Sequence, residues 1–202
     1  MIRPPAKRPH RAKVSLDREH VGERLRALRK SHSLTLKELS QRSGVALSTL
    51  SKMELGQISV SYEKLAAAAN ALQVDIAQLF DERATVAPNA RAPVVVRSTP
   101  QDAPHYDADN YDYRMLATAF PNRRMTPLLG SIVARERSEF PDYIRHGGQE
   151  FVMVLSGRVR ILFETGEEIE LSRQESAYFD SGVGHIYLSV GRVDAQVVVV
   201  MA

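Results

Sequence analysis

The segment 35–56, TLKELSQRSGVALSTLSKMELG, predicts two short helices joined by a tight turn. Thr35 and Glu38 have the T-x-x-E spacing of a capping box, so the first helix should begin at Thr35. Gly44 has no Cβ and can adopt the positive φ that a tight turn needs. A second helix is expected from about residue 46 to 54. Two short helices joined by a glycine turn form a helix-turn-helix.

Three further helices are expected around this pair, over 19–30, over 62–72 and from residue 75 onward. The first is indicated by the helical spacing of its apolar residues. The second has a favourable N-cap in Ser61, and an alanine-rich run with high helix propensity. Asp75 can cap the third, whose apolar residues would close the core. Five helices in about 60 residues predict a compact bundle.

Residues 20–80 resemble the five-helix DNA-binding domain of the lambda-repressor-like, XRE-type regulators. ERLRALRKS, TLKELSQRSGVALSTLSKMELG and SYEKLAAAANAL match the successive segments of that family in order and spacing. The resemblance implies that a double-stranded DNA operator is a partner, with the second helix of the pair in its major groove. The expected DNA-binding residues are Thr35, Ala46, Leu47, Ser48, Thr49, Ser51 and Lys52. Of these, Lys52 and Ser48 are the main candidates for base contacts, although some of the set could face phosphates or water instead.

Two departures and one pair refine this expectation. Leu36 stands where the family often has a polar DNA contact, and Ala46 stands where a Ser or Thr cap is usual. A missing cap forfeits about 0.5–2 kcal/mol. Arg29 and Glu54 match positions where related repressors pair the first helix with the recognition helix. We therefore expect a structural ion pair between them.

Composition and charge narrow the class of protein. The chain has no cysteine, which excludes a disulfide scaffold and a thiolate zinc site. It has no apolar run of 18 residues and no apolar segment near its start, which predicts a cytoplasmic protein without a membrane partner. Residues 1–83 hold 15 Lys and Arg against 9 Asp and Glu, whereas 84–202 hold 12 against 15. The excess of positive charge on the helical part favours phosphate binding. We interpret the basic, proline-rich residues 1–17 as a disordered arm, which either lies along DNA or has no role.

Beyond residue 83 the helical pattern ends, and 84–92 is expected to be a linker. Runs with period two and many β-branched residues then predict strands at 94–97, 111–116, 128–135, 150–157, 158–164, 168–171, 176–179, 185–190 and 195–201. The segment 99–112 is interpreted as an acidic loop. Many short strands with glycine turns predict an antiparallel sandwich or barrel over 93–202. The expected fold class is α+β, with a helical domain over 18–83 followed by this β domain.

Two stretches of the β domain resemble the cupin family. His146-Gly-Gly-Gln-Glu150 followed by FVMVLSG resembles the first cupin motif, and LSRQESAYFDSGVGH, 171–185, resembles the second, with His185 as its histidine. The resemblance implies a double-stranded β-helix, or jelly roll, with these side chains inside. An XRE-type domain followed by a cupin is similar to a family of bacterial transcriptional regulators that dimerise through the cupin.

The cupin resemblance implies a metal or ligand site, and the sequence departs from the usual ligand set. Ile144 stands where the first histidine of the motif would be. His146, Glu150 and His185 could still hold a divalent metal (zinc, iron or nickel) as a two-histidine, one-carboxylate face. We expect instead that the barrel binds a small organic effector, with any metal secondary, through a set of polar and aromatic residues. That set is His146, Glu150, His185, Tyr178, Tyr187 and Arg135. A third reading is that these are hydrogen-bonded core residues without a ligand.

Two classes of function follow. The first is a non-enzymatic transcriptional regulator, a repressor in the simplest case, whose cupin senses a small molecule and which binds DNA as a homodimer or higher even oligomer. The second is a metal-dependent cupin enzyme, an oxygenase or isomerase, with an accessory DNA-binding module. A third alternative is a regulator whose cupin domain senses a metal ion. The lost ligand at Ile144 favours the regulator.

Overall fold

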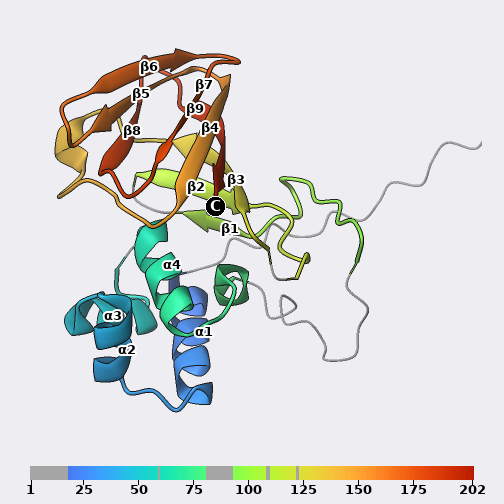
Figure 1. The fold of residues 1–202 in the computed structure, drawn as a ribbon, viewed down its shortest axis with the longest axis vertical. Helices are drawn as coiled ribbons and strands as arrows, with labels where there is room; N and C mark the ends of the chain where they lie inside the picture. The colour runs from blue at the N-terminus through green and yellow to red at the C-terminus, as the bar shows by residue number, and fades with distance from the viewer. Residues whose placement is uncertain (1–17, 59, 81–92, 108–109, 122) are drawn as a thin grey trace, which may run out of the picture.

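The protein has a helical part and a β-rich part, which lie at opposite ends of the molecule (Figure 1). The structure is a computed structural model that describes residues 18–58, 60–80, 93–107, 110–121 and 123–202. The predicted arm, 1–17, and linker, 84–92, lie outside the described residues. Within the described residues, none of the helices combines the length and the apolar character needed to cross a bilayer.

The helices of the N-terminal part lie near the positions predicted from the sequence, but the last of them is a 3-10 helix. Its elements are α1 (Arg18–Ser31), α2 (Leu36–Ser43), α3 (Leu47–Glu54), α4 (Tyr62–Ala71) and the 3-10 helix η1 (Ile76–Leu79). The prediction of five α-helices is therefore wrong, because residues 76–79 make a single short 3-10 helix in place of the fifth. The carboxylate of Asp75, which precedes it, accepts hydrogen bonds from Arg123 of the β-rich part.

The caps of α2 follow the sequence closely. Thr35 Oγ1 accepts a hydrogen bond from the backbone of Glu38 at 3.2 Å, and the Glu38 carboxylate accepts one from the Thr35 backbone at 2.8 Å. This is the predicted capping box. Gly44 ends α2 with φ 72°, as expected for the turn. Ala46 provides no side-chain cap for α3, and Ser61 provides none for α4, because its hydroxyl donates to the Glu63 side chain instead.

The helical core brings α1 and α3 unusually close together. Leu25, Leu39 and Leu50 are completely buried in it. Gly22 of α1 faces the backbone of α3, and a Cβ at this position would lie 2.3 Å from the carbonyl oxygen of Met53. The absence of a side chain at Gly22 is thus what allows the two helices to touch.

The described residues of the β-rich part form nine strands in two antiparallel sheets. They are β1 (His105–Asp107), β2 (Tyr111–Met115), β3 (Thr126–Ile132), β4 (Gln149–Ser156), β5 (Arg158–Phe163), β6 (Glu168–Ser172), β7 (Ser176–Asp180), β8 (His185–Ser189) and β9 (Ala195–Met201). One sheet has the order β1-β2-β3-β9-β4-β7 and the other the order β6-β5-β8. The two sheets face each other across a core of aliphatic side chains that includes Leu128, Val152, Val154, Ile161 and Ile186. The α+β, two-domain fold class is confirmed.

Two predictions about strands are wrong. The segment 94–97 forms no strand among the described residues, and Val94 keeps 94% of its surface exposed. Within the segment predicted as an acidic loop, 99–112, residues 105–107 form β1, which pairs with Asp112 to Arg114 of β2. β1 was not predicted because it is short and is flanked by acidic residues, so it has no alternating apolar pattern.

The two parts are joined through α4 and the residues on either side of it. Before α4, the backbone N–H of Val60 donates to the Tyr106 hydroxyl at 2.8 Å. Tyr62, the first residue of α4, packs edge-on against Tyr113 of β2 with ring centroids 6.3 Å apart. After α4, Arg123 Nε donates to Asp75 at 3.1 Å. These contacts hold α4 against the mouth of the barrel (Figure 1).

Candidate functional site

The first candidate site is the outer face of α3. Leu47, with 47% of its surface exposed, stands at the N-terminal end of α3, and Ser48 and Lys52 are also exposed. Thr49 and Ser51 are half-buried. The face thus offers one apolar, one hydroxyl and one ammonium group, which can contact a thymine methyl, a base edge and a guanine or a phosphate. The remaining predicted residues precede the helices, and the hydroxyl of Thr35 is engaged with Glu38.

An ion pair fixes α3 from behind. Arg29 Nε lies 2.5 Å from Glu54 Oε1, and Arg29 Nη2 lies 2.9 Å from Glu54 Oε2. A third nitrogen, Nη1, donates to the carbonyl of Leu34 at 2.7 Å. The hydrogen bond with Glu54 raises the pKa of Arg29. The predicted pair between the first helix and the recognition helix is confirmed, and Glu54 is too buried to contact DNA.

The second candidate site lies inside the barrel, close to α4. His146 precedes β4, and its backbone N–H donates to the carbonyl of Ser181 at 3.0 Å. Glu150 is the second residue of β4 and faces inward between β7 and β9. His185 begins β8, where it forms a bridge with Ile144. Segments far apart in sequence therefore bring the three predicted side chains together.

The three side chains converge on a single carboxylate oxygen. His146 Nε2 lies 2.8 Å from Glu150 Oε2, and His185 Nε2 lies 3.6 Å from the same oxygen. One ligand atom from each residue lies within 4.8 Å of the others. The other carboxylate oxygen, Oε1, accepts a hydrogen bond from the Tyr187 hydroxyl. The histidine nitrogens and Oε2 thus form one face, and Oε1 is held by Tyr187.

Electrostatics keep this group charged despite its burial. Burial acts to raise the pKa of Glu150, but hydrogen bonds from His146 and Tyr187, together with the charge of His185, outweigh it and lower that pKa to about 2. Burial acts to lower the pKa of His185, but the charge of Glu150 and the carbonyl of Val183 raise it. Burial, with the Glu150 charge, raises the pKa of Tyr187 well above its ordinary value. Glu150 is therefore ionised, and Tyr187 remains a proton donor to it.

The donor set fits a divalent metal. His185 Nδ1 lies 2.9 Å from the carbonyl oxygen of Val183, which can only accept, so Nδ1 carries a proton and Nε2 is the available ligand atom. Metal-binding histidines are typically oriented by such a second hydrogen bond. Tyr187 orients Glu150 in the same way. Two imidazole nitrogens and one carboxylate oxygen suit zinc or iron.

The space beside these three residues is small. The cavity measures about 30 Å³ and is lined in part by Tyr62, Tyr111, Tyr113 and Tyr187. One water occupies roughly 30 Å³ in the liquid, so the cavity suits an ion with a small ligand better than an organic molecule. Tyr111 supports the wall by accepting a hydrogen bond from the backbone of Tyr187 at 2.9 Å.

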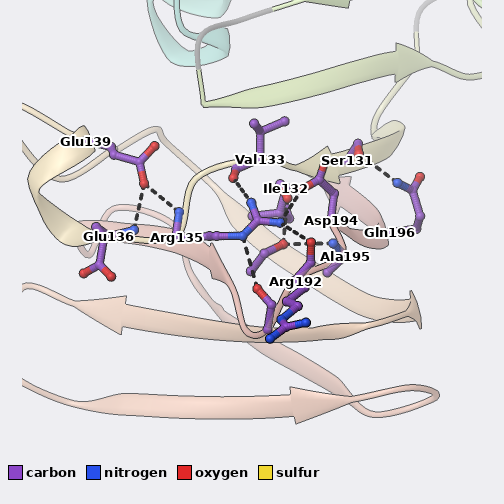
Figure 2. A network of polar contacts seen from close by, with 12 residues as sticks. Ser131, Ile132, Val133, Arg135, Glu136, Glu139, Arg192, Asp194, Ala195 and Gln196 are labelled. Carbon is purple, nitrogen blue, oxygen red and sulfur yellow. Dashed lines mark hydrogen bonds and ion pairs between the residues drawn. The ribbon is translucent and has the colours of Figure 1, made fainter.

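The structure does not bring two of the predicted effector residues to this cavity. Tyr178 points out of β7, is 65% exposed and donates to Gln149. Arg135 lies in a loop network at another place on the barrel (Figure 2). Its guanidinium donates to Asp194 at 2.7 Å and to the carbonyl of Val133 at 2.6 Å, with further bonds to the loop at 191–192. Arg135 thus holds the β3 and β8–β9 loops together and does not line the cavity.

The sequence missed the residues that close the site from the helical side. Tyr62 of α4 lies edge-on to His146, with ring centroids 6.4 Å apart, and Glu63 lines the same cavity. Nothing in the sequence pattern of a helical domain indicates that its fourth helix enters a barrel. Tyr111 and Tyr113 carried a weak signal, because they lie in a predicted strand at positions of the same face.

Comparisons with known proteins agree with this two-part architecture. Residues 25–79 match the helix-turn-helix family model, and residues 133–201 match the cupin domain model. The N-terminal part is therefore similar to the helix-turn-helix family, and the C-terminal part is similar to the cupin family. The resemblance to XRE-type regulators with a C-terminal cupin is confirmed. Among curated proteins, none matches the sequence.

One solved structure shares this fold over most of the chain. A helix-turn-helix family transcriptional regulator from Vibrio cholerae is 20% identical, with a TM-score of 0.61, and the match covers 93% of this chain and 97% of that one. Hydroxypropylphosphonic acid epoxidase from S. wedmorenis is 21% identical, with a TM-score of 0.49, and the match covers 95% and 100%. The first of these similarities extends the fold assignment to both domains and their order.

Proposed function

We propose that the protein is a sequence-specific DNA-binding transcriptional regulator, in the simplest case a repressor. The observation that carries this proposal is the helix-turn-helix with an exposed α3 face, backed by the buried pair of Arg29 and Glu54. The excess of Lys and Arg in residues 1–83 supports it, because a positive field draws a protein to phosphates. No catalytic role is assigned to the barrel in this proposal.

The regulator acts as a two-fold dimer. One helix-turn-helix buries little surface on DNA, and two copies read half-sites about one helical turn apart. Such dimers bind pseudo-palindromic operators, because the symmetry of the DNA site mirrors that of the protein. The barrel, which has edge strands β1 and β6, is the part of the chain that provides the pairing surface.

The test of this proposal is selection from a library of randomised duplexes by the full-length protein. A repeated, pseudo-palindromic sequence should be enriched, and Lys52→Ala should weaken its binding. If the full-length protein is folded by circular dichroism and enriches no sequence above background, the proposal fails. Enrichment of a single, non-repeated half-site would support the proposal of a DNA-binding regulator and contradict the proposal that it acts as a dimer.

We propose further that His146, Glu150 and His185 hold a divalent metal ion. The proposal is supported by the convergence of their ligand atoms and by the small cavity beside them. A bound ion would supply a Lewis-acidic centre. Around it, Val183 keeps the ring of His185 oriented, and Tyr187 holds the far oxygen of Glu150.

The metal proposal is tested by elemental analysis of purified full-length protein. About one divalent ion per chain is expected, and Glu150→Gln should weaken its retention at least tenfold, because the neutral amide is a poor ligand for a cation. Glu170→Gln is the matched control, since Glu170 is an exposed carboxylate of β6 paired with Arg158. Equal metal content in both variants would refute the proposal.

A metal-dependent enzyme, an oxygenase or isomerase, is the second candidate function. It is favoured by the two-histidine, one-carboxylate face, which leaves open positions on an iron or zinc ion. Removal of the ion by a chelator separates the candidates. A large change in operator affinity indicates a metal-sensing regulator, whereas a tightly held ion without influence on DNA binding favours the enzyme.

A further inference from the structure

A second, larger cavity lies between α4 and the barrel. It measures about 600 Å³, within the size range of sites for small organic molecules, and domain interfaces are a preferred place for such sites. Its walls are one face of α4, the segment 123–126, the segment 145–147 and the end of β9. We refer to it as the interdomain cleft. Its size and position make it a better place for an organic molecule than the 30 Å³ cavity inside the barrel.

The face of α4 that lines the cleft carries small side chains in its middle, which leave space for a ligand. Ala66 and Ala67 follow Tyr62 and Glu63 by one helical turn, and Asn70 follows by another. Alanine at both positions keeps the middle of this wall shallow and apolar. Together with Val74, Ile76 and Met201, the two alanines offer an apolar surface to a ligand.

Three arginines line the cleft, and two of them are already paired. Arg123 donates to Asp75 and to the carbonyl of Leu116. Arg145 donates to Glu164 and Asp142. Arg124 forms no hydrogen bond or ion pair with the residues that the structure describes, although it is exposed in the same wall. It is therefore the cation available to a ligand.

The charge around Arg124 selects the kind of anion. Glu63 lines the same cleft, and its carboxylate opposes the entry of a doubly charged phosphate, whereas the charge of Asp75 there is matched by Arg123. A single guanidinium group matches the charge and the planar geometry of one carboxylate. We propose that the interdomain cleft binds a small organic monocarboxylate, with its carboxylate on Arg124 and its apolar body on the alanine face of α4.

This site is separate from the metal site but touches it. The cleft and the small cavity share Tyr62, Glu63, His146 and Met201 as lining residues. A ligand in the cleft contacts the helical domain through α4 and the barrel through His146 at the same time. Where the regulator proposal holds, such a ligand is placed to change how the helix-turn-helix is presented. The binding itself does not depend on that proposal.

The experiment uses the full-length protein with hexanoate, phenylacetate and indole-3-acetate, each beside its primary amide. Binding is measured by isothermal titration calorimetry. At least one carboxylate should bind, and its amide should bind at least tenfold more weakly, because a hydrogen bond to a charged group is lost. Arg124→Ala should weaken binding by a similar factor, and Ala66→Trp should block it by filling the cleft. Arg173→Ala is the matched control, because it removes an exposed arginine from the β6–β7 turn, away from the cleft.

Several outcomes would overturn the proposal. They are the absence of binding by all three carboxylates, equal binding of an acid and its amide, and unchanged binding by Arg124→Ala. Glu150→Gln separates this site from the metal site, since it removes a metal ligand and leaves Arg124 in place. Binding that persists in Glu150→Gln supports the cleft. Binding lost in Glu150→Gln but kept in Arg124→Ala would assign the ligand to the metal instead.

Discussion

Lys52 is the single basic residue of α3, and it lies on the exposed face of that helix. We expect Lys52→Ala to weaken operator binding by about 1–3 kcal/mol if it contacts a base, and to relax preference at that position. If it contacts a phosphate, the loss should be similar for all sequences. Fluorescence anisotropy with operator and mismatched duplexes distinguishes the two results. Lys64→Ala removes an equal charge from exposed Lys64 of α4 and should leave base preference unchanged.

Glu54 is the residue whose loss should affect stability more than recognition. Glu54→Ala leaves the guanidinium of Arg29, only 11% exposed, without its carboxylate partner. Removal of one member of a buried pair costs about 3 kcal/mol, so the urea midpoint of the helical signal at 222 nm should fall. The double variant Arg29→Met, Glu54→Leu should recover part of this loss, because neither charge remains buried. A changed operator consensus at unaltered stability would make Glu54 a reader of DNA instead.

At the scale of elements, the contact of α1 with α3 depends on Gly22. Alanine favours a helix interior over glycine by about 1 kcal/mol, yet we expect Gly22→Ala to destabilise the helical domain. The added Cβ would meet the Met53 carbonyl at 2.3 Å, and the clash requires α1 to move away from α3. Thermal unfolding followed at 222 nm measures the effect. Glu23→Ala, at the next and exposed position, is the control and should change stability little.

The elements were predictable from sequence where local chemistry determines them. The capping box at Thr35, the turn at Gly44 and the strands around the cupin motifs have direct signals. The segment 94–97 has strand composition but pairs with no strand among the described residues, and pairing is a property of the whole sheet that the segment's own residues do not encode. The role of Gly22 could not be predicted from the sequence either, because it depends on the close approach of the α3 backbone.

The candidate site was predictable in the same partial way. His146, Glu150 and His185 follow from motif spacing, and the structure brings them together. Tyr178 was included because it lies near the second motif in sequence, and Arg135 because its guanidinium can receive a carboxylate. Neither argument determines the side of a strand or the loop that a side chain joins. Tyr62 could not be found, because its contact with His146 depends on how two domains pack.

At the scale of the whole molecule, the uneven charge of the chain should govern its response to salt. The excess of positive charge lies in residues 1–83. Each phosphate contact contributes about −0.9 to the slope of log affinity against log salt. We expect the DNA affinity of the full-length protein to fall steeply as the salt concentration rises. An affinity that does not change with salt would mean that phosphate contacts contribute little. Titrations at several salt concentrations provide the measurement.

The expected dimer is the other property at this scale. Size-exclusion chromatography with light scattering should give twice the 22.5 kDa mass of one chain. Two recognition helices on one duplex require this assembly or a higher even one. A monomer at micromolar concentration, both alone and with operator duplex, would contradict the dimer.

The contact of Tyr62 with His146 links the helical domain to the barrel, and this link has a consequence for measurements of both metal binding and DNA binding. Binding free energies at two coupled sites obey reciprocity, so any factor by which an ion in the barrel changes affinity for DNA equals the factor by which DNA changes affinity for the ion. An operator duplex is then itself a modulator of the barrel. Metal affinity determined on the free protein would differ from that of the protein on its operator, and the ratio would report the strength of the connection through α4.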